Sequence, residues 1–178
     1  MQHRLPILLA CVHLPSKLNR SPDSQLLDCF DLARQIGVEE QRAGHSRTIV
    51  VGDFNLNPFE NGMVSSSGLN SVMSRQVASR GSRTVDDRVL PFFYNPMWTR
   101  FGDGVDTTSY FYDASEPVNY YWNIFDQVLI RPELANRFDT TKLEILRDAG
   151  PISLVSGNGR PDRRVGSDHL PIRFEVEF

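Results

Sequence analysis

Polar side chains stand at the ends of apolar runs in two parts of this sequence. Asp53 and Asn55 follow an apolar run that ends at Gly52, and Asp168 and His169 stand directly before a second run. An acid, an amide and a histidine at strand edges can supply a cation anchor, a general base and phosphate contacts. Metal-assisted attack on a phosphate ester needs these groups. The residue types therefore indicate phosphate-ester hydrolysis.

Asp168 and His169 are neighbours on a segment expected to be extended, so their side chains point to opposite sides. The carboxylate can hold a cation while the imidazole faces the substrate. Asp126, inside an aromatic and aliphatic run, is the acid that could orient His169. The structural alternatives are a histidine with only a structural role and a salt bridge from Asp126 to a nearby arginine such as Arg131.

Asp53 and Asn55 are expected where a buried strand emerges, the edge at which open α/β sheets place ligands. The carboxylate can orient water or a leaving group, and the amide can hold a phosphate oxygen. His13 is the first polar side chain at the exit of another apolar strand. The alternatives are turn chemistry for Gly52-Asp53 and a strand-capping role for His13.

A strand, a helix and a second strand are expected to position these groups. Residues 5–14 are nearly all apolar, as in a strand covered on both faces. Ser21 and Pro22 are a cap and a first helical residue, and apolar helical spacing continues to about Gly37. Residues 48–52 form the second buried strand. This order implies a parallel or mixed sheet with a crossover helix.

The rest of the chain is expected to be mostly short strands. A short helix is predicted from Leu69 to about Ala78, followed by an irregular excursion from Ser79 to Gly104 that suits substrate selection. Further strands are predicted at residues 107–112, 122–130, 143–146 and 172–178.

Composition sets broad limits on the function. The 178 residues are 40% hydrophobic, which suits one globular domain, and the net charge is only −3. No global field therefore marks a partner such as nucleic acid, although Arg160, Arg163 and Arg164 could grip phosphates or form a solvated loop. No apolar run is long enough to cross a bilayer, and no secretory signal begins at Met1, so a cytoplasmic location is the default expectation, open only if residues upstream of Met1 are missing.

Taken together and in order, His13-Leu14, Gly52-Asp53-Phe54-Asn55, Asp126 in an aromatic-rich strand and Ser167-Asp168-His169 resemble the endonuclease/exonuclease/phosphatase superfamily of DNase I-like hydrolases. The resemblance runs from about residue 5 to the end. It implies an α/β fold, a DNase I-like sandwich of two β-sheets flanked by helices. An earlier half of the family domain, with an Asn and a metal-binding Glu, has no counterpart here, so residues 1–178 are expected to be a single, incomplete domain.

The resemblance also implies a role for each site residue. His169 would be the general base that activates water, Asp126 its orienting partner, and Asp168 a ligand of Mg²⁺ or Mn²⁺. Asp53 and Asn55 would position water, leaving group and phosphate. His13 would contact the scissile phosphate or act as an acid.

The substrate, the function and the association state are not decided by the residues alone. The substrate is a phosphate mono- or diester, either nucleic acid or a small-molecule or lipid phosphate. A non-catalytic or truncated member of the same fold that acts as a binding module is the alternative function. Because residues 5–14 would expose an apolar strand if neighbours are missing, we expect self-association or a complementing chain.

Overall fold

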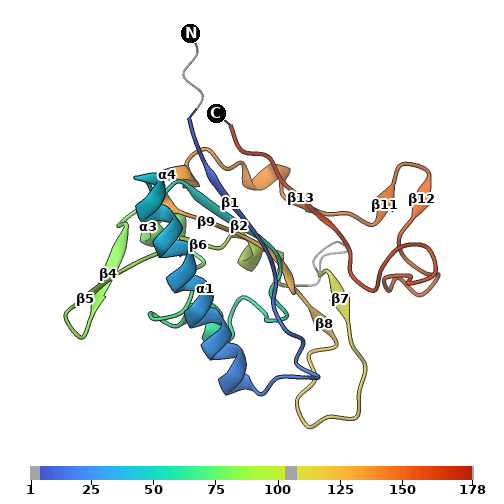
Figure 1. Cartoon of the computed structure of the whole chain (residues 1–178). Helices are drawn as coiled ribbons and strands as arrows, with labels where there is room; N and C mark the ends of the chain where they lie inside the picture. The colour runs from blue at the N-terminus through green and yellow to red at the C-terminus, as the bar shows by residue number, and fades with distance from the viewer. Residues whose placement is uncertain (1–4, 103–107, 178) are drawn as a thin grey trace.

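A computed structural model describes residues 5–102 and 108–177. Its main feature is a five-stranded mixed sheet in the order β1-β2-β9-β6-β3 (Figure 1). β1 (Leu8–His13) runs parallel to β2 (Thr48–Asp53), and β9 (Asp126–Ile130) runs antiparallel to β2. The prediction of a mixed α/β protein with a crossover helix between the first two strands is confirmed.

The crossover helix α1 (Pro22–Ala43) begins as its sequence predicts but ends later. The Ser21 hydroxyl accepts a hydrogen bond from the Ser24 N–H at 3.2 Å, and Pro22 is the first helical residue. The predicted end near Gly37 is wrong. The helix continues to Ala43, and Gly44, the next residue, takes a left-handed conformation with φ of 68° and caps the helix end.

Each face of the sheet packs against its own apolar core. The face toward α1 buries Val50, Leu129 and Phe93 with Cys29 and Ile36 of the helix. The opposite face buries Ile49, Val128 and Ile130 against the chain that follows β9. That segment includes α4 (Pro132–Ala135), η2 (Thr140–Lys142), β10 (Glu144–Ile145) and β13 (Ile172–Arg173).

β1 is an edge strand, and only one of its faces is covered. Ala10 and Val12 pack toward α1, whereas Leu9 is 58% exposed and Cys11 is also exposed. The prediction that both faces of this strand are buried is wrong. The apolar layer that buries Ile49 and Val128 on the same face of the sheet therefore does not extend over Leu9 of this edge strand.

The predicted helix from Leu69 to Ala78 is wrong for most of its length. Only α3 (Arg75–Ala78) is helical, and β3 (Ser71–Val72) pairs parallel with β6 (Phe93–Tyr94). The Asn95 N–H donates to the Val72 carbonyl at 2.9 Å. Long-range pairing therefore overrides the local helical spacing.

The segment from Ser79 to Gly104, predicted to be irregular, contains a hairpin. β4 (Ser82–Val85) and β5 (Arg88–Pro91) are joined by Asp86 and Asp87, whose φ angles of 48° and 60° fit a tight hairpin turn. A short 3₁₀ helix, η1 (Pro96–Arg100), follows β6. Residues 103 and 104 of this prediction lie outside the described part of the chain.

The remaining predicted strands are present but shorter. β7 (Tyr110–Phe111) pairs with β8 (Trp122–Asn123), while Thr107 lies outside the described residues. β10 pairs with β13, and Val176 adds an isolated bridge to Phe138. The other elements are the short helix α2 (Asn61–Val64) and the hairpin of β11 (Asp148–Ala149) and β12 (Ile152–Ser153).

The described residues form one five-stranded sheet and several two-stranded ones. The two-sheet sandwich, the single incomplete domain and the DNase I-like identity therefore stay predictions. No helix in the described ranges has the length and hydropathy that crossing a bilayer requires.

Candidate active site

Three predicted site residues lie in one row across β1, β2 and β9, at the end of the sheet where β2 finishes. In the strand register His13 lies opposite Asp53, and Asp53 lies opposite Asp126. Directly opposed residues on neighbouring strands project from the same face of the sheet. Three residues that are far apart in sequence are thereby placed side by side.

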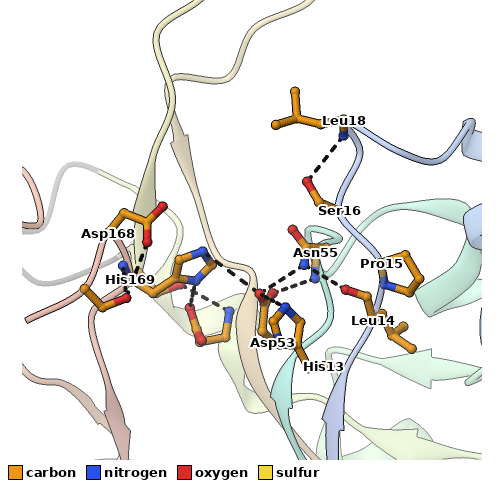
Figure 2. A network of polar contacts seen from close by, with 12 residues as sticks. His13, Leu14, Pro15, Ser16, Leu18, Asp53, Asn55, Asp168 and His169 are labelled. Carbon is orange, nitrogen blue, oxygen red and sulfur yellow. Dashed lines mark hydrogen bonds and ion pairs between the residues drawn. The ribbon is translucent and has the colours of Figure 1, made fainter. Parts of the chain in front are cut away.

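His169 completes this row from the segment before β13. Its Nδ1 lies 2.7 Å from Asp126 Oδ2, which confirms the prediction that the two residues are within hydrogen-bond reach. An ionised carboxylate only accepts, so Nδ1 carries the proton and donates it to Asp126. Nε2 then faces Asp53, whose Oδ2 is 4.0 Å away. Figure 2 shows the imidazole turned toward Asp53 and His13.

Ser109 holds the chain segments of Asp126 and His169 together. Its hydroxyl accepts a hydrogen bond from the Asp126 N–H at 3.2 Å, and its carbonyl accepts one from the Leu170 N–H at 2.8 Å. The residue is fully buried. Sequence reasoning missed this positioning residue, since a serine in a β-forming segment carries no signal of what it contacts.

Tyr110 is the second residue that sequence reasoning missed. It forms an isolated antiparallel bridge with His169, and the centroids of the two rings are 4.6 Å apart. Phe125 lies 5.2 Å from Tyr110 in a stacked arrangement. The aromatic rings fix one face of the imidazole and shield it from water.

Asn55 joins the exits of β1 and β2. Its Nδ2 donates to the Leu14 carbonyl at 2.8 Å and to Asp53 Oδ2 at 3.0 Å, and its backbone N–H donates to Asp53 Oδ1 at 2.8 Å (Figure 2). Both amide hydrogens are therefore engaged within the protein. Asn55 orients Asp53, and its contact with a phosphate stays a prediction.

Gly52 permits the close approach of β1 to Asp53. Its φ is 143°, and a Cβ added there would lie 2.0 Å from the Val12 carbonyl oxygen. Any larger residue would push the strands apart. The glycine of the Gly-Asp pair is thus required by strand packing.

His13 is the most accessible member of the row. Its side chain is 81% exposed, and Nε2 lies 3.5 Å from Asp53 Oδ2. An imidazole at this position can meet a substrate arriving from solvent. The geometry is compatible with phosphate contact or proton donation, both of which stay predictions.

Burial and the surrounding charges shift the pKa values of Asp53 and His169. Burial raises the pKa of Asp53, and the nearby Asp126 charge adds to the rise, while the Asn55 backbone hydrogen bond and the histidines oppose it. Burial alone would lower the pKa of His169, but the hydrogen bond to Asp126 and the surrounding carboxylates outweigh it, so this pKa is raised. Titratable groups perturbed in one place are typical of functional sites.

Asp168 lies beside His169, on the side farther from Asp53 (Figure 2). Its carboxylate pairs with the Arg163 guanidinium. Burial opposes ionisation, yet the bond and charge of Arg163 prevail and the pKa of Asp168 is lowered. This predicted metal ligand is therefore a carboxylate already neutralised by an arginine.

The predicted Mg²⁺ or Mn²⁺ site does not fit these residues by themselves. Within the described ranges no three His, Cys, Asp or Glu side chains are grouped so that they could hold a metal ion. Mg²⁺ requires near-octahedral oxygen ligation, which one arginine-bound carboxylate cannot provide.

The basic residues near the site are also engaged. Arg164 pairs with Asp162 at 2.8 Å, and Arg160 lies 3.8 Å from Asp113. Arg131, the alternative partner for Asp126, instead binds Glu40 of α1 at 2.8 Å. The salt-bridge alternative for Asp126 is therefore wrong.

The structure thus brings His13, Asp53, Asn55, Asp126 and His169 together, with Asp168 adjacent. Neither a scan of protein-family models nor a search of curated proteins finds a match to this chain. The resemblance to the DNase I-like hydrolases accordingly stays a prediction carried by the motifs.

Proposed function

We propose that this protein is a phosphoesterase that hydrolyses a phosphate mono- or diester by attack of a water molecule activated by His169. The observation that supports the proposal most is the 2.7 Å contact between His169 Nδ1 and Asp126 Oδ2. That contact fixes the tautomer in which Nε2 is the free base, and it directs Nε2 toward Asp53.

Each residue of the row has a part in the proposed reaction. Water gives a proton to His169 Nε2, and its oxygen forms the new bond to phosphorus while the ester P–O bond breaks. Asp53 orients the water or the leaving oxygen. His13, the exposed imidazole 3.5 Å from Asp53, contacts the phosphate or returns a proton to the leaving oxygen.

The proposed reaction does not depend on a divalent cation. The resemblance assigns Mg²⁺ or Mn²⁺ to Asp168, but the described side chains offer that ion too few ligands. No step of the proposed reaction therefore requires a cation. The proposed base and its orienting acid act without one on a substrate whose leaving group is already good.

The test uses bis(p-nitrophenyl) phosphate, whose leaving group needs little help. The purified chain should release p-nitrophenolate slowly, and His169→Ala should reduce the rate by about 10²- to 10⁴-fold, the usual contribution of a general base. The melting temperature should be nearly unchanged at about pH 9, where the contact with Asp126 adds little to stability. His45→Ala is the matched control, because His45 lies just after α1, away from the row, and its side chain accepts a hydrogen bond from the Arg47 N–H. Equal rates for the His169 variant and the parent chain would refute the proposal.

One observation favours the alternative of a non-catalytic binding module with this fold. The pairing of Asp168 with Arg163 leaves the predicted metal ligand occupied. A chain that binds a phosphate ester with its row of polar residues but never turns it over would establish this second function.

A further inference from the structure

A cavity of about 490 Å³ lies between α1 and the β4–β5 hairpin, which stands beside the helix at the left of Figure 1. Its lining comes from α1, the turn after α2, β5, β6 and Arg131. Arg131 follows the last residue of β9, whereas Asp126 begins that strand and belongs to the row. The cavity is therefore at the opposite end of β9 from the proposed catalytic residues, and the proposed reaction does not use it.

Small residues of α1 leave this cavity open. Ala33 and Gly37 are four residues apart, so they lie on one side of the helix, and both belong to the lining. Nothing lies within 4 Å of a Cβ built on Gly37. The packing of the helix thus does not require glycine there, and the missing side chain adds to the hollow.

A buried ion pair forms part of the lining. The Arg131 guanidinium binds Glu40 through Nε at 2.8 Å and through Nη2 at 3.1 Å, and the arginine side chain is only 5% exposed. Glu40 Oε1 also accepts a hydrogen bond from the Thr48 hydroxyl at 2.6 Å. Glu40 is the only acid among the described residues of the lining, and its charge is neutralised within the protein.

The other two charged residues of the lining are arginines. Arg34 lies 3.5 Å from Asp31 in an (i, i+3) pair whose side chains are 68% and 69% exposed, and such pairs are weak in water. Arg88 has no ion-pair partner in residues 5–102 and 108–177. Asp86 and Asp87, in the turn of the same hairpin, lie outside the lining. The cavity therefore has two cations, one on the helix and one on the hairpin, that no acid of the lining neutralises.

The remaining polar groups of the lining can donate hydrogen bonds. Ser66 and Ser67 stand in the turn after α2, which the Gly68 N–H closes by donating to the Ser65 carbonyl at 3.1 Å. Within the described ranges neither the hydroxyl nor the N–H of either serine has a hydrogen-bond partner. Guanidinium and N–H groups only donate, and a hydroxyl can donate. A negatively charged group with several acceptor oxygens is the complement of this set.

The rest of the lining is largely apolar. Leu69 and Phe93 are almost fully buried, and Phe30, Leu90 and Pro91 complete this part. A volume of about 490 Å³ is within the usual range for a site that holds a small organic molecule, and it greatly exceeds the volume of a phosphate or sulfate ion. The ligand that fits has an apolar body as well as an acidic group.

We propose that this cavity binds a small organic anion. The acidic group lies between Arg34 and Arg88 and accepts hydrogen bonds from the two serines, and the apolar body lies against Phe30, Leu90 and Phe93. This site is separate from the catalytic row, so the inference does not rest on the proposed function. The chemistry that it recognises is an oxyanion on an apolar body.

The test is an NMR titration of the purified chain with 1-naphthalenesulfonate, which has an apolar body and an acidic group and contains no ester to hydrolyse. Each backbone amide is followed separately, so binding at another site does not obscure the result. The amides of Gly37, Ser67 and Leu90 should shift together. The neutral 1-naphthalenemethanol should bind this site at least about fivefold more weakly, because it lacks the negative charge that Arg34 and Arg88 attract.

Variants separate the contributions of charge and shape. Arg34→Gln and Arg88→Gln should each weaken binding of the sulfonate by about 3- to 10-fold. Gly37→Leu should remove binding, because the new side chain fills the cavity at a position where nothing obstructs its Cβ. Arg42→Gln is the matched control for charge and should leave the affinity unchanged. Arg42 also lies on α1 in an exposed (i, i+3) pair, with Glu39 at 2.8 Å, but it is outside the lining.

Three results would overturn the inference. They are shifts confined to residues around the catalytic row, a difference of less than about fivefold between the two probes, and unchanged affinity in either arginine variant or in Gly37→Leu. The comparison of the two probes needs only the parent chain, so a variant that fails to fold does not remove the test. His169→Ala should leave the affinity of this site unchanged, and a loss of affinity there would place the probe in the row instead. Turnover of bis(p-nitrophenyl) phosphate is measured independently, so either proposal can fail without the other.

Discussion

Asp53 and Asp126 lie directly opposite each other on β2 and β9, and one imidazole, His169, approaches both carboxylates. Two acids side by side repel each other when both are charged, which contributes to the raised pKa of Asp53. An imidazolium between them relieves that repulsion. The pair therefore favours the protonated form of His169, which is the form that a general base reaches after it takes a proton from water.

The first prediction concerns pH. Asp126→Asn should lower the pKa of His169, because the hydrogen-bonded carboxylate is the main influence raising it. The pKa of His169 is higher in the folded protein than in the unfolded chain, so the contact of the protonated imidazole with Asp126 stabilises the fold. This stabilisation is complete at a pH below the unfolded-state pKa, and it is lost as the pH rises through the folded-state pKa. The variant should thus lose more free energy of unfolding at about pH 5 than at about pH 9.

The measurement is an NMR titration of the histidine side chains in EDTA, combined with denaturant unfolding at both pH values. His45→Gln identifies the signals of the one histidine that lies at the end of α1. An unchanged His169 midpoint in Asp126→Asn would show that the 2.7 Å contact does not set the protonation of the base.

The second prediction concerns Gly52. Gly52→Ala should lower the free energy of unfolding by about 1–3 kcal/mol, because the residue takes a backbone conformation that side chains rarely adopt and the new Cβ meets the Val12 carbonyl. The separation of β1 from β2 should also move His13 away from Asp53. Denaturant unfolding reports the first effect. Gly37→Ala is the control, since nothing lies within 4 Å of a Cβ at that helical position and the change should be neutral or stabilising.

The third prediction concerns the divalent cation. The chain should bind Mg²⁺ weakly and show little hydrolysis of unactivated diesters. Arg163→Ala should strengthen Mg²⁺ binding, because it frees the Asp168 carboxylate. Isothermal titration with Mg²⁺ measures this change, and Arg88→Ala on the β4–β5 hairpin is the control. Rapid, EDTA-sensitive cleavage of an ordinary phosphodiester by the monomeric chain would show that other residues build the metal site.

The fourth prediction concerns the open face of β1. Leu9 and Cys11 present an apolar surface at a sheet edge, so the chain should self-associate or accept a complementing polypeptide. Leu9→Lys should shift the population toward monomer in analytical ultracentrifugation. Val89→Lys, at a site that is 68% exposed on the β4–β5 hairpin, should leave the distribution unchanged.

Cys11 supplies a second readout of the same surface. Burial raises the pKa of Cys29 to about 12, so a maleimide should react with Cys11 first. Labelling of Cys11 should slow as the protein concentration rises and the β1 face becomes covered. A labelling rate independent of concentration would place any association elsewhere.

The sequence predicts the members of the site better than the scaffold that holds them. His13, Asp53 and Asp126 are polar residues at strand ends, and the spacing of strand, helix and strand is enough to expect two of them at one edge. The contacts of Ser109 and Tyr110, the pairing of Arg163 with Asp168 and the β3–β6 pairing join residues far apart in the chain or hidden within loops. A single sequence shows local periodicity and turn residues, and neither of these predicts contacts between distant parts of the chain.

The catalytic row shares one face of its strands with an apolar core, so both depend on the same strand register. His13, Asp53 and Asp126 project from the face that also buries Ile49, Val128 and Ile130, whereas Val50 and Leu129 point toward α1. Deletion of one codon within β2 would invert every following side chain, so the Asp53 carboxylate would enter the apolar layer under the helix. An unpaired charge there costs several kcal/mol. The insertion or deletion of one residue in this strand should therefore remove the site and the fold together. An insertion or deletion of two residues keeps every following side chain on its original face of the sheet.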